Sequence, residues 1–245
     1  MSYWLRRHPL LVTAFFRHTL VLTYALPAER LQPLLPPGLS VDTYGRLGFI
    51  AIAMVQTEAL RPAGLPARLG RNFFLSGYRV FARYGRLRGL RILRSDTDSR
   101  LMVFAGNLLT HYNYRRAAVR VEETGDTLRI NVGTGLSVEA DLASRPASLP
   151  PGSPFRDLRE ARRFAGPLPF TFDYEPETHS LVIIEAAREQ WEPEPVRVVV
   201  YRNEFFAGPQ WQGVEPVLAN AFYVGGVSYR WKRGVVHALP KEVAT

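Results

Sequence analysis

The sequence predicts a mainly β (α+β) fold, an antiparallel β-barrel with a few short helices on its periphery. Many short apolar runs with strand-like patterns are separated by turns that contain Gly or Pro, and few segments have a helical pattern. The 19 glycines and 19 prolines are scattered, and no linker or internal repeat divides the chain. We therefore expect a single domain over residues 1–245.

The first quarter of the chain predicts a strand, a short helix and a hairpin. Residues 19–25 alternate like a strand, and residues 27–31 begin a helix with Pro in its first turn. Residues 39–43 and 47–57 flank Tyr44-Gly45-Arg46, and this pattern predicts a hairpin in which Gly45 supplies the unusual turn conformation.

The middle of the chain predicts two more hairpins around one helix. Residues 73–84 and 87–93 are separated by a glycine turn, and residues 119–123 and 128–132 flank Thr124-Gly125-Asp126. Between these hairpins, residues 99–109 have a helical pattern, with Ser99 available as the N-cap.

The last third predicts one short helix and several strands. Ser153-Pro154 before residues 155–164 is typical of an N-cap followed by Pro in the first helical turn. Further strands are predicted at residues 181–187, 196–201 and 222–231.

Composition excludes several classes of partner and site. The net charge of +9 suggests a nucleic-acid partner, but the arginines are spread along the chain, so we expect no nucleic acid. The absence of Cys excludes disulfides, thiolate nucleophiles and Cys-ligated metals. The apolar run 47–55 is far shorter than the roughly 20 residues of a membrane-spanning helix, and no signal-peptide cleavage site follows the N-terminal apolar residues. We expect a cytoplasmic protein without a membrane partner.

The segment from Gly106 to Ala117, GNLLTHYNYRRA, carries the strongest functional pattern. Arg115 and Arg116 follow His111 and Tyr114 where a strand begins. His111 is a candidate general acid or base because its ordinary pKa of about 6.5 suits proton transfer, although histidines among aromatic residues are more often core residues.

No cofactor or metal is expected. The histidines, at positions 8, 18, 111, 179 and 237, lack the close spacing of metal ligands, and no phosphate-binding or dinucleotide motif is present.

The order of these elements and motifs resembles the acetoacetate decarboxylase-like superfamily, and within it the uncharacterised DUF2071 (YqjF-like) family. The resemblance extends from about Arg17 to Trp231. It is carried by Leu31–Leu39 (LQPLLPPGL), by Gly89–Arg100 with its Ser95-Asp96, by Asn107–Ala117, and by Gln190-Trp191-Glu192-Pro193. It implies the β-barrel of the decarboxylase with a pocket inside.

The resemblance also implies positions for the site residues. Arg17 matches the pocket arginine on the first strand of the decarboxylase. The two acidic residues of that family fall near Ile50 and Leu75, so both acids are lost here. Its lysine pair falls on Arg115 and Arg116.

This exchange removes the Schiff-base chemistry of the decarboxylase. An imine requires a primary amine that can lose its proton, and a guanidinium cannot do so. The only lysines are Lys232 and Lys241, both near the C-terminus. Arginines can instead hold a carboxylate through paired hydrogen bonds, although adjacent strand residues point to opposite faces and only one of the pair can face a pocket.

We therefore expect a barrel pocket that binds a small organic acid through Arg17, Arg115 and Arg116, without Schiff-base decarboxylation. One alternative is an enzyme that acts on a small carboxylate or keto acid by acid–base chemistry, with His111 or Tyr114 moving protons. Another is a structural or oligomer-forming module with a filled barrel. The sequence leaves open whether the protein is an enzyme and whether it forms a homo-oligomer.

Overall fold

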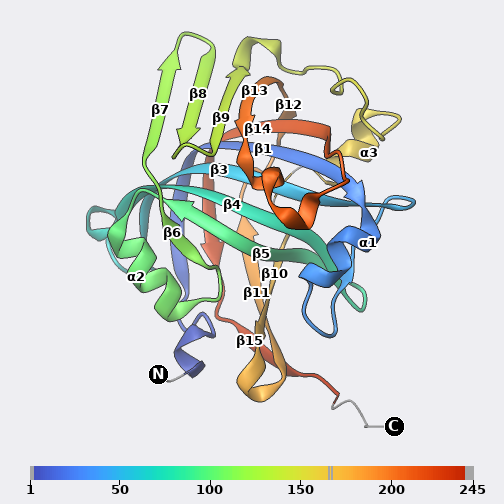
Figure 1. Ribbon diagram of the computed structural model, residues 1–245. Helices are drawn as coiled ribbons and strands as arrows, with labels where there is room; N and C mark the ends of the chain where they lie inside the picture. Colours follow the sequence, from blue (N-terminus) through green and yellow to red (C-terminus); the bar gives the residue numbers. More distant parts are fainter. Residues whose placement is uncertain (1–2, 165, 167, 241–245) are drawn as a thin grey trace.

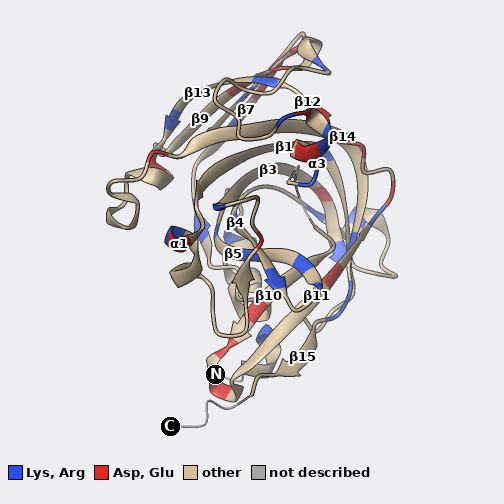
Figure 2. Cartoon of the chain, turned by 90° about the vertical axis from the view of Figure 1, so that its right-hand side faces the viewer, with Lys and Arg blue, Asp and Glu red and all other residues tan. Residues whose placement is uncertain are grey.

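One large, highly curved sheet forms the body of the protein in this computed structural model, which describes residues 3–164, 166 and 168–240. Its strands follow the order β12-β14-β1-β3-β4-β5-β10-β11-β15, and β11 also pairs with β14, so the pairings run in a ring (Figure 2). Most neighbours are antiparallel, while β5 pairs in parallel with β10 and with β6. The predicted mainly β fold is confirmed, and its main sheet is highly curved.

The strands of this sheet are β1 (Val12–Pro27), β2 (Ser40–Val41), β3 (Leu47–Pro62), β4 (Arg71–Tyr84), β5 (Leu87–Thr97), β6 (Tyr114–Arg116), β10 (Phe170–Glu175), β11 (Ser180–Arg188), β12 (Glu194–Pro195), β14 (Val217–Trp231) and β15 (Val235–Ala238). A second sheet contains β7 (Val119–Thr124), β8 (Thr127–Val132), β9 (Leu136–Asp141) and β13 (Arg197–Asn203).

The second sheet covers part of the outer face of the first (Figure 1). Ile130 and Val138 of the small sheet belong to the same apolar core as Leu22 of β1 and Ile52 of β3. The neighbouring β3 residues, such as Ala51, point inward and are also buried. Burial on both faces explains the uninterrupted apolar sequence of this strand.

Within the described part of the chain, three α-helices and several 3₁₀ turns lie around the sheets. The α-helices are α1 (Ala28–Leu31), α2 (Arg100–Leu109) and α3 (Leu158–Arg162), and the 3₁₀ turns are η1 (Tyr3–Arg6), η2 (Gln32–Leu34), η3 (Ala67–Leu69), η4 (Leu142–Ser144), η5 (Pro176–Thr178), η6 (Glu204–Ala207) and η7 (Pro209–Trp211). Among the described residues, no helix is both long and apolar enough to cross a membrane.

The two longer α-helices lie on opposite sides of the curved sheet (Figure 1). α2 begins as predicted, because the Ser99 hydroxyl accepts a hydrogen bond from Met102 N at 3.2 Å. Near α3, the rings of Phe155 and Phe164 pack on Phe49 of β3, at centroid distances of 5.2 and 4.2 Å. These aromatic rings fill one part of the interior of the sheet.

Two predictions about local structure are wrong. β2 pairs with Ala82–Arg83 of β4 and does not form a hairpin with β3, because β3 pairs with β4 only as far as Val80 and leaves those positions free. The predicted turn at 44–47 is nevertheless present. Asp157, not Ser153, caps α3, since the Asp157 carboxylate accepts from Glu160 N at 2.8 Å.

Gly106 allows α2 to lie directly on β6. A Cβ at this position would collide with the ring of Tyr114. We expect Gly106→Ala to lower the free energy of unfolding by about 1–3 kcal/mol, because the cost of overpacking exceeds the gain in helix propensity.

Urea denaturation would measure this change, with Gly135→Ala as the control because its Cβ would meet only Glu204, at 3.6 Å. The control should change stability by less than about 0.5 kcal/mol. Equal stability of Gly106→Ala and wild type would contradict the tight packing of α2.

Candidate functional site

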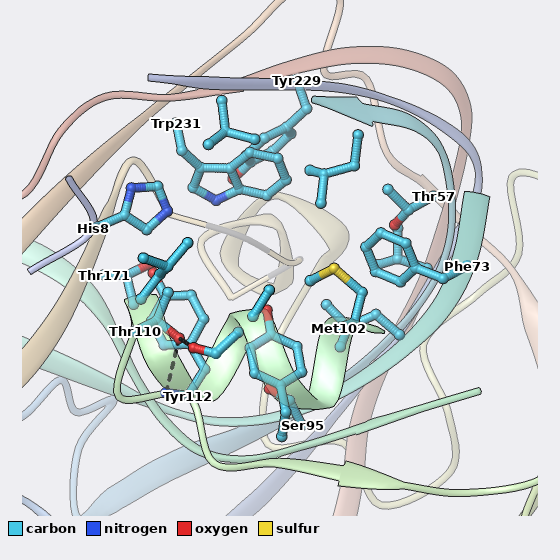
Figure 3. Close-up of a pocket in the computed structure, with 18 of the residues that line it drawn as sticks. His8, Thr57, Phe73, Ser95, Met102, Thr110, Tyr112, Thr171, Tyr229 and Trp231 are labelled. Atoms are coloured by element: carbon cyan, nitrogen blue, oxygen red, sulfur yellow. Dashed lines mark hydrogen bonds between the residues drawn. The ribbon is translucent and has the colours of Figure 1, made fainter. Parts of the chain in front are cut away.

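A cavity of about 350 Å³ lies inside the curved sheet, beside the aromatic rings that fill the other part (Figure 3). Strands β1, β3, β4, β5, β10 and β14 contribute to its wall. Helix α2 and the segment 110–114 cover it, and residues 8–10 complete the lining. The interior is therefore not completely filled by side chains.

Most of the wall is apolar. The large apolar side chains that line the cavity are Leu10, Val12, Phe16, Val55, Leu60, Phe73, Leu75, Leu90, Ile92, Leu101, Met102, Leu109, Leu168 and Trp231. Leu75, where the resemblance implies a lost acidic residue, is one of them. Ile50, the other such position, points to the opposite face and packs against the small sheet. Among the residues that the structure describes, no Asp, Glu or Lys lines the cavity.

Arg79 places a positive charge inside this wall. It lies in the middle of β4, and its side chain folds over Gly77, where a Cβ would come within 2.8 Å of Arg79 Nε. Nε is buried and has no hydrogen-bond partner among the described residues. Burial lowers the pKa of Arg79, but the group stays protonated at neutral pH because the ordinary pKa of arginine is above about 12.

Three tyrosines surround this guanidinium. Tyr112, Tyr114 and Tyr229 line the cavity and are the titratable groups that act on Arg79. Burial raises the pKa of all three phenols, so they are neutral hydrogen-bond donors at neutral pH. The arrangement thus combines one uncompensated cation with neutral donors, which is suited to an anionic group.

Several other buried polar atoms of the lining lack partners. Thr19 Oγ1, His8 Nδ1 and Tyr112 Oη form no hydrogen bond within the part of the chain that the structure describes. Thr171 lies beside the Tyr112 hydroxyl, but not in hydrogen-bonding geometry. Because an unsatisfied buried polar group costs about 1–3 kcal/mol, such a cluster is typical of a site that receives a ligand.

The cavity opens to solvent where lining residues are also exposed. Leu10 and Leu101 are 40% and 49% exposed, and Arg71 is exposed as well. Arg61 lines the cavity and is held there by hydrogen bonds to the carbonyls of Ala59 and Leu65, at 2.7 and 2.8 Å. Two arginines and apolar side chains therefore line the cavity along with Arg79.

None of the three arginines predicted from the sequence lines the cavity. Arg17 follows Phe16 at a bulge in β1. Its side chain is exposed, and its Nη1 lies 3.7 Å from Glu58 Oε1. On β6, Tyr114 takes the inward position, Arg115 pairs with Asp96 in register, and Arg116 ends the strand; both arginines are exposed. The expectation that these three arginines lie inside the pocket is therefore corrected. Their role in ligand binding stays a prediction, and it would have to be played at the outer surface.

The predicted acid–base candidates are separated. Tyr114 lines the cavity, whereas His111 is half-buried outside the lining and its backbone N–H donates to Asp173 Oδ2 at 3.3 Å. Burial lowers the pKa of His111, so its ring is neutral at neutral pH. A proton-transfer role for either residue stays a prediction.

The described lysine is also remote from the cavity. Lys232 follows β14, its side chain is 53% exposed, and Nζ lies 2.8 Å from Glu185 Oε1. Lys241 lies outside the described residues. The described residues contain no group of three or more His, Asp and Glu side chains that could hold a metal ion.

Sequence reasoning missed Arg79 and His8. For Arg79 a signal was available, because it is the only charged residue within the apolar stretch 73–82 (FFLSGYRVFA). For His8 no local pattern exists, since its place in the lining depends on contacts with distant segments.

Asp173 acts electrostatically on Tyr112 and Tyr114, and it offers a test of how burial affects a titratable group near the cavity. It is completely buried on β10 and accepts from Arg91 Nη1 at 3.1 Å, yet desolvation outweighs this attraction and raises its pKa from 3.8 to about 6. The folded state therefore binds this proton more tightly than the unfolded chain does. This carboxyl group lowers stability progressively as the pH rises from about 4 to about 6.

We expect the stability of Asp173→Asn relative to wild type to increase by up to about 3 kcal/mol between pH 4 and pH 7. Urea denaturation at both pH values would measure the difference, with Asp126→Asn in an exposed turn as the control. A relative stability that falls with pH would show that Arg91 dominates instead.

Comparisons with known proteins agree with this fold. The acetoacetate decarboxylase of Legionella pneumophila superposes with a TM-score of 0.66 at 12% identity, over 92% of this chain and 87% of that one. An acetoacetate decarboxylase-like enzyme from Sphingomonas wittichii RW1 gives 0.56 at 15% identity, over 96% and 95%. The enduracididine biosynthesis enzyme MppR, complexed with pyruvate, gives 0.59 at 10% identity, over 93% and 90%. At these identities the likeness concerns the fold alone.

The family assignment comes from the sequence. Curated proteins give no match. The model of the DUF2071 family, described as an uncharacterized conserved protein, matches residues 13–228. Because this match covers most of the sequence, the chain belongs to the DUF2071 family.

Proposed function

We propose that the cavity binds a small monocarboxylic acid with an apolar body, and that the carboxylate lies on Arg79. The observation that carries this proposal is the Arg79 side chain, whose Nε is buried without a hydrogen-bond partner among the described residues, in a cavity whose described lining contains no acidic residue. Removing a cation from water is costly unless the cation is paired. A ligand carboxylate supplies the negative charge and the hydrogen-bond acceptors that Arg79 lacks among the described residues.

The surroundings of Arg79 define the kind of acid. Tyr112, Tyr114 and Tyr229 can donate to a carboxylate without adding charge, so the immediate surroundings of Arg79 suit a single carboxylate. The apolar wall favours a hydrocarbon body. The volume of about 350 Å³ is more than twice the roughly 150 Å³ that holds benzene in an engineered protein cavity. Medium-chain or aryl acids therefore fit better than acetate.

We further infer that this site works without a Schiff base. The guanidinium of Arg79 cannot form an imine, and the exposed, ion-paired Lys232 is outside the cavity. Arg115 and Arg116 are exposed on the outer surface, and their guanidinium groups cannot form an imine either.

Replacement of Arg79 tests the binding proposal. We expect Arg79→Gln to weaken octanoate binding about 10- to 100-fold, because a charge-assisted hydrogen bond contributes about 1.5–3 kcal/mol. Isothermal titration calorimetry would measure the affinities. Arg86→Gln, in the exposed turn between β4 and β5, removes the same charge and should bind octanoate normally. The neutral ligand 1-octanol should bind wild type much more weakly than octanoate.

The melting temperature of Arg79→Met gives a second test of the proposed role of Arg79. This substitution replaces a partly buried cation, which has no acidic partner among the described residues, by an apolar side chain, so the ligand-free variant should melt at a higher temperature than wild type. Unchanged octanoate affinity in Arg79→Gln would refute the proposed role of Arg79. Loss of binding in Arg115→Gln or Arg116→Gln instead would locate the acid at the surface.

Borohydride reduction tests the absence of an imine. We expect no covalent adduct after incubation with acetoacetate or pyruvate and reduction, as measured by intact-protein mass spectrometry. As a control, an aldehyde resin treated with butylamine carries an imine, and its reduction verifies that the borohydride is active. A reduced adduct mapped to Lys232 or Lys241 would overturn the inference.

A further inference from the structure

His8 occupies an unusual backbone position at the cavity. Its φ of 52° lies in the left-handed region, which is strained for a residue other than glycine, and Pro9 follows it. The other non-glycine residues with positive φ among those described, Ala59, Asn113, His179 and Gln190, do not line the cavity. Strain of this kind persists where surrounding contacts impose it, and it is concentrated at functional sites.

Contacts from three distant segments hold His8 in this conformation. Arg7 forms a two-pronged ion pair with the completely buried Glu175, with Nε–Oε2 at 2.9 Å and Nη2–Oε1 at 2.6 Å. The His8 N–H donates to the carbonyl of Leu109 at 3.0 Å, and its carbonyl accepts from Gly234 N at 3.1 Å. The residue is thus fixed from α2, β10 and the link after β14.

The fixed backbone presents the imidazole to the cavity. His8 is only 8% exposed, and its ring lies 6.5 Å from that of Tyr112, between centroids. In Figure 3 it lies at one side of the cavity, next to Trp231 and Thr171 and across from Thr57 and Phe73. Nδ1 is buried and has no partner among the described residues. Burial lowers the pKa of His8, so the ring is neutral near pH 7 and able to accept a proton.

We propose that His8 is the general base of a catalytic site in this cavity, and that the site enolises a 2-oxo acid whose carboxylate lies on Arg79. This inference rests on the proposed function. A simple carboxylic acid has no C–H acidic enough for an imidazole, whereas the carbonyl of a 2-oxo acid acidifies the adjacent C3–H. The carbonyl next to the carboxylate also brings both groups to the same donors, Arg79 and Tyr112.

The step is a reversible proton transfer. An imidazole nitrogen of His8 takes a proton from C3, the C–H electron pair forms the C2–C3 double bond, and the carbonyl π electrons move to the oxygen. The Tyr112 hydroxyl and the Arg79 guanidinium stabilise the resulting enolate. The imidazolium exchanges its proton with solvent and returns a solvent proton to C3, so no other reactant is consumed.

Hydrogen–deuterium exchange at C3 of 2-oxooctanoate in D₂O, followed by proton NMR, tests this proposal. Wild type should accelerate exchange over buffer, and His8→Asn should lower the enzymatic rate by about 100-fold or more. Asn is chosen because it tolerates the left-handed backbone conformation. His179→Asn makes the same replacement at a φ of 49° outside the cavity and should exchange at the wild-type rate.

Calorimetry on the same samples separates the two proposals. His8→Asn should bind 2-oxooctanoate with nearly wild-type affinity and should melt cooperatively. Arg79-dependent binding without exchange by wild type would overturn the enolisation and leave the proposed function intact. Exchange that survives in a folded His8→Asn variant would overturn the role of His8. Failure of wild type to bind either octanoate or 2-oxooctanoate would refute both.

Discussion

Burial of the central strands on both faces is the constraint on which the rest of this structure depends. The middle of β3 packs outward on the small sheet through Ile52 and inward through Ala51. A polar side chain on the inner face therefore cannot reach bulk water past the sheet. Phe155 and Phe164 fill part of that interior, and the remainder is the cavity. Arg79 places a charge in this cavity, and the described lining contains no acidic partner for it.

The sequence predicted the main elements of the fold where the signal is local. The apolar run of β3, the hairpin of β4 and β5, and the Ser99 cap of α2 follow from patterns that neighbouring residues determine. The β2 pairing could not be predicted in this way, because it depends on where β3 stops pairing with β4.

The sequence also led to a segment that borders the cavity, but to side chains other than those in the lining. The segment 106–117 does border the cavity through Gly106 and Tyr114. Its arginines do not, because the inward position of the short β6 belongs to Tyr114 and the strand ends at Arg116. The arginines that do line the cavity are Arg61 of β3 and Arg71 and Arg79 of β4. His8 could not be identified from the sequence, since the neighbouring Arg7 is anchored by Glu175, which is 168 positions away from Arg7 along the chain.

A fold shared at low identity with acetoacetate decarboxylases does not carry their chemistry with it. In this chain the described cavity lining contains three arginines and three tyrosines, and no described lysine. The most direct measurement is a crystal structure of the protein with octanoate bound. We expect the carboxylate within about 3 Å of the Arg79 guanidinium and the hydrocarbon chain against the apolar wall, as the proposed binding site requires. Octanoate found only on surface arginines such as Arg115, with Arg79 unpaired, would contradict it.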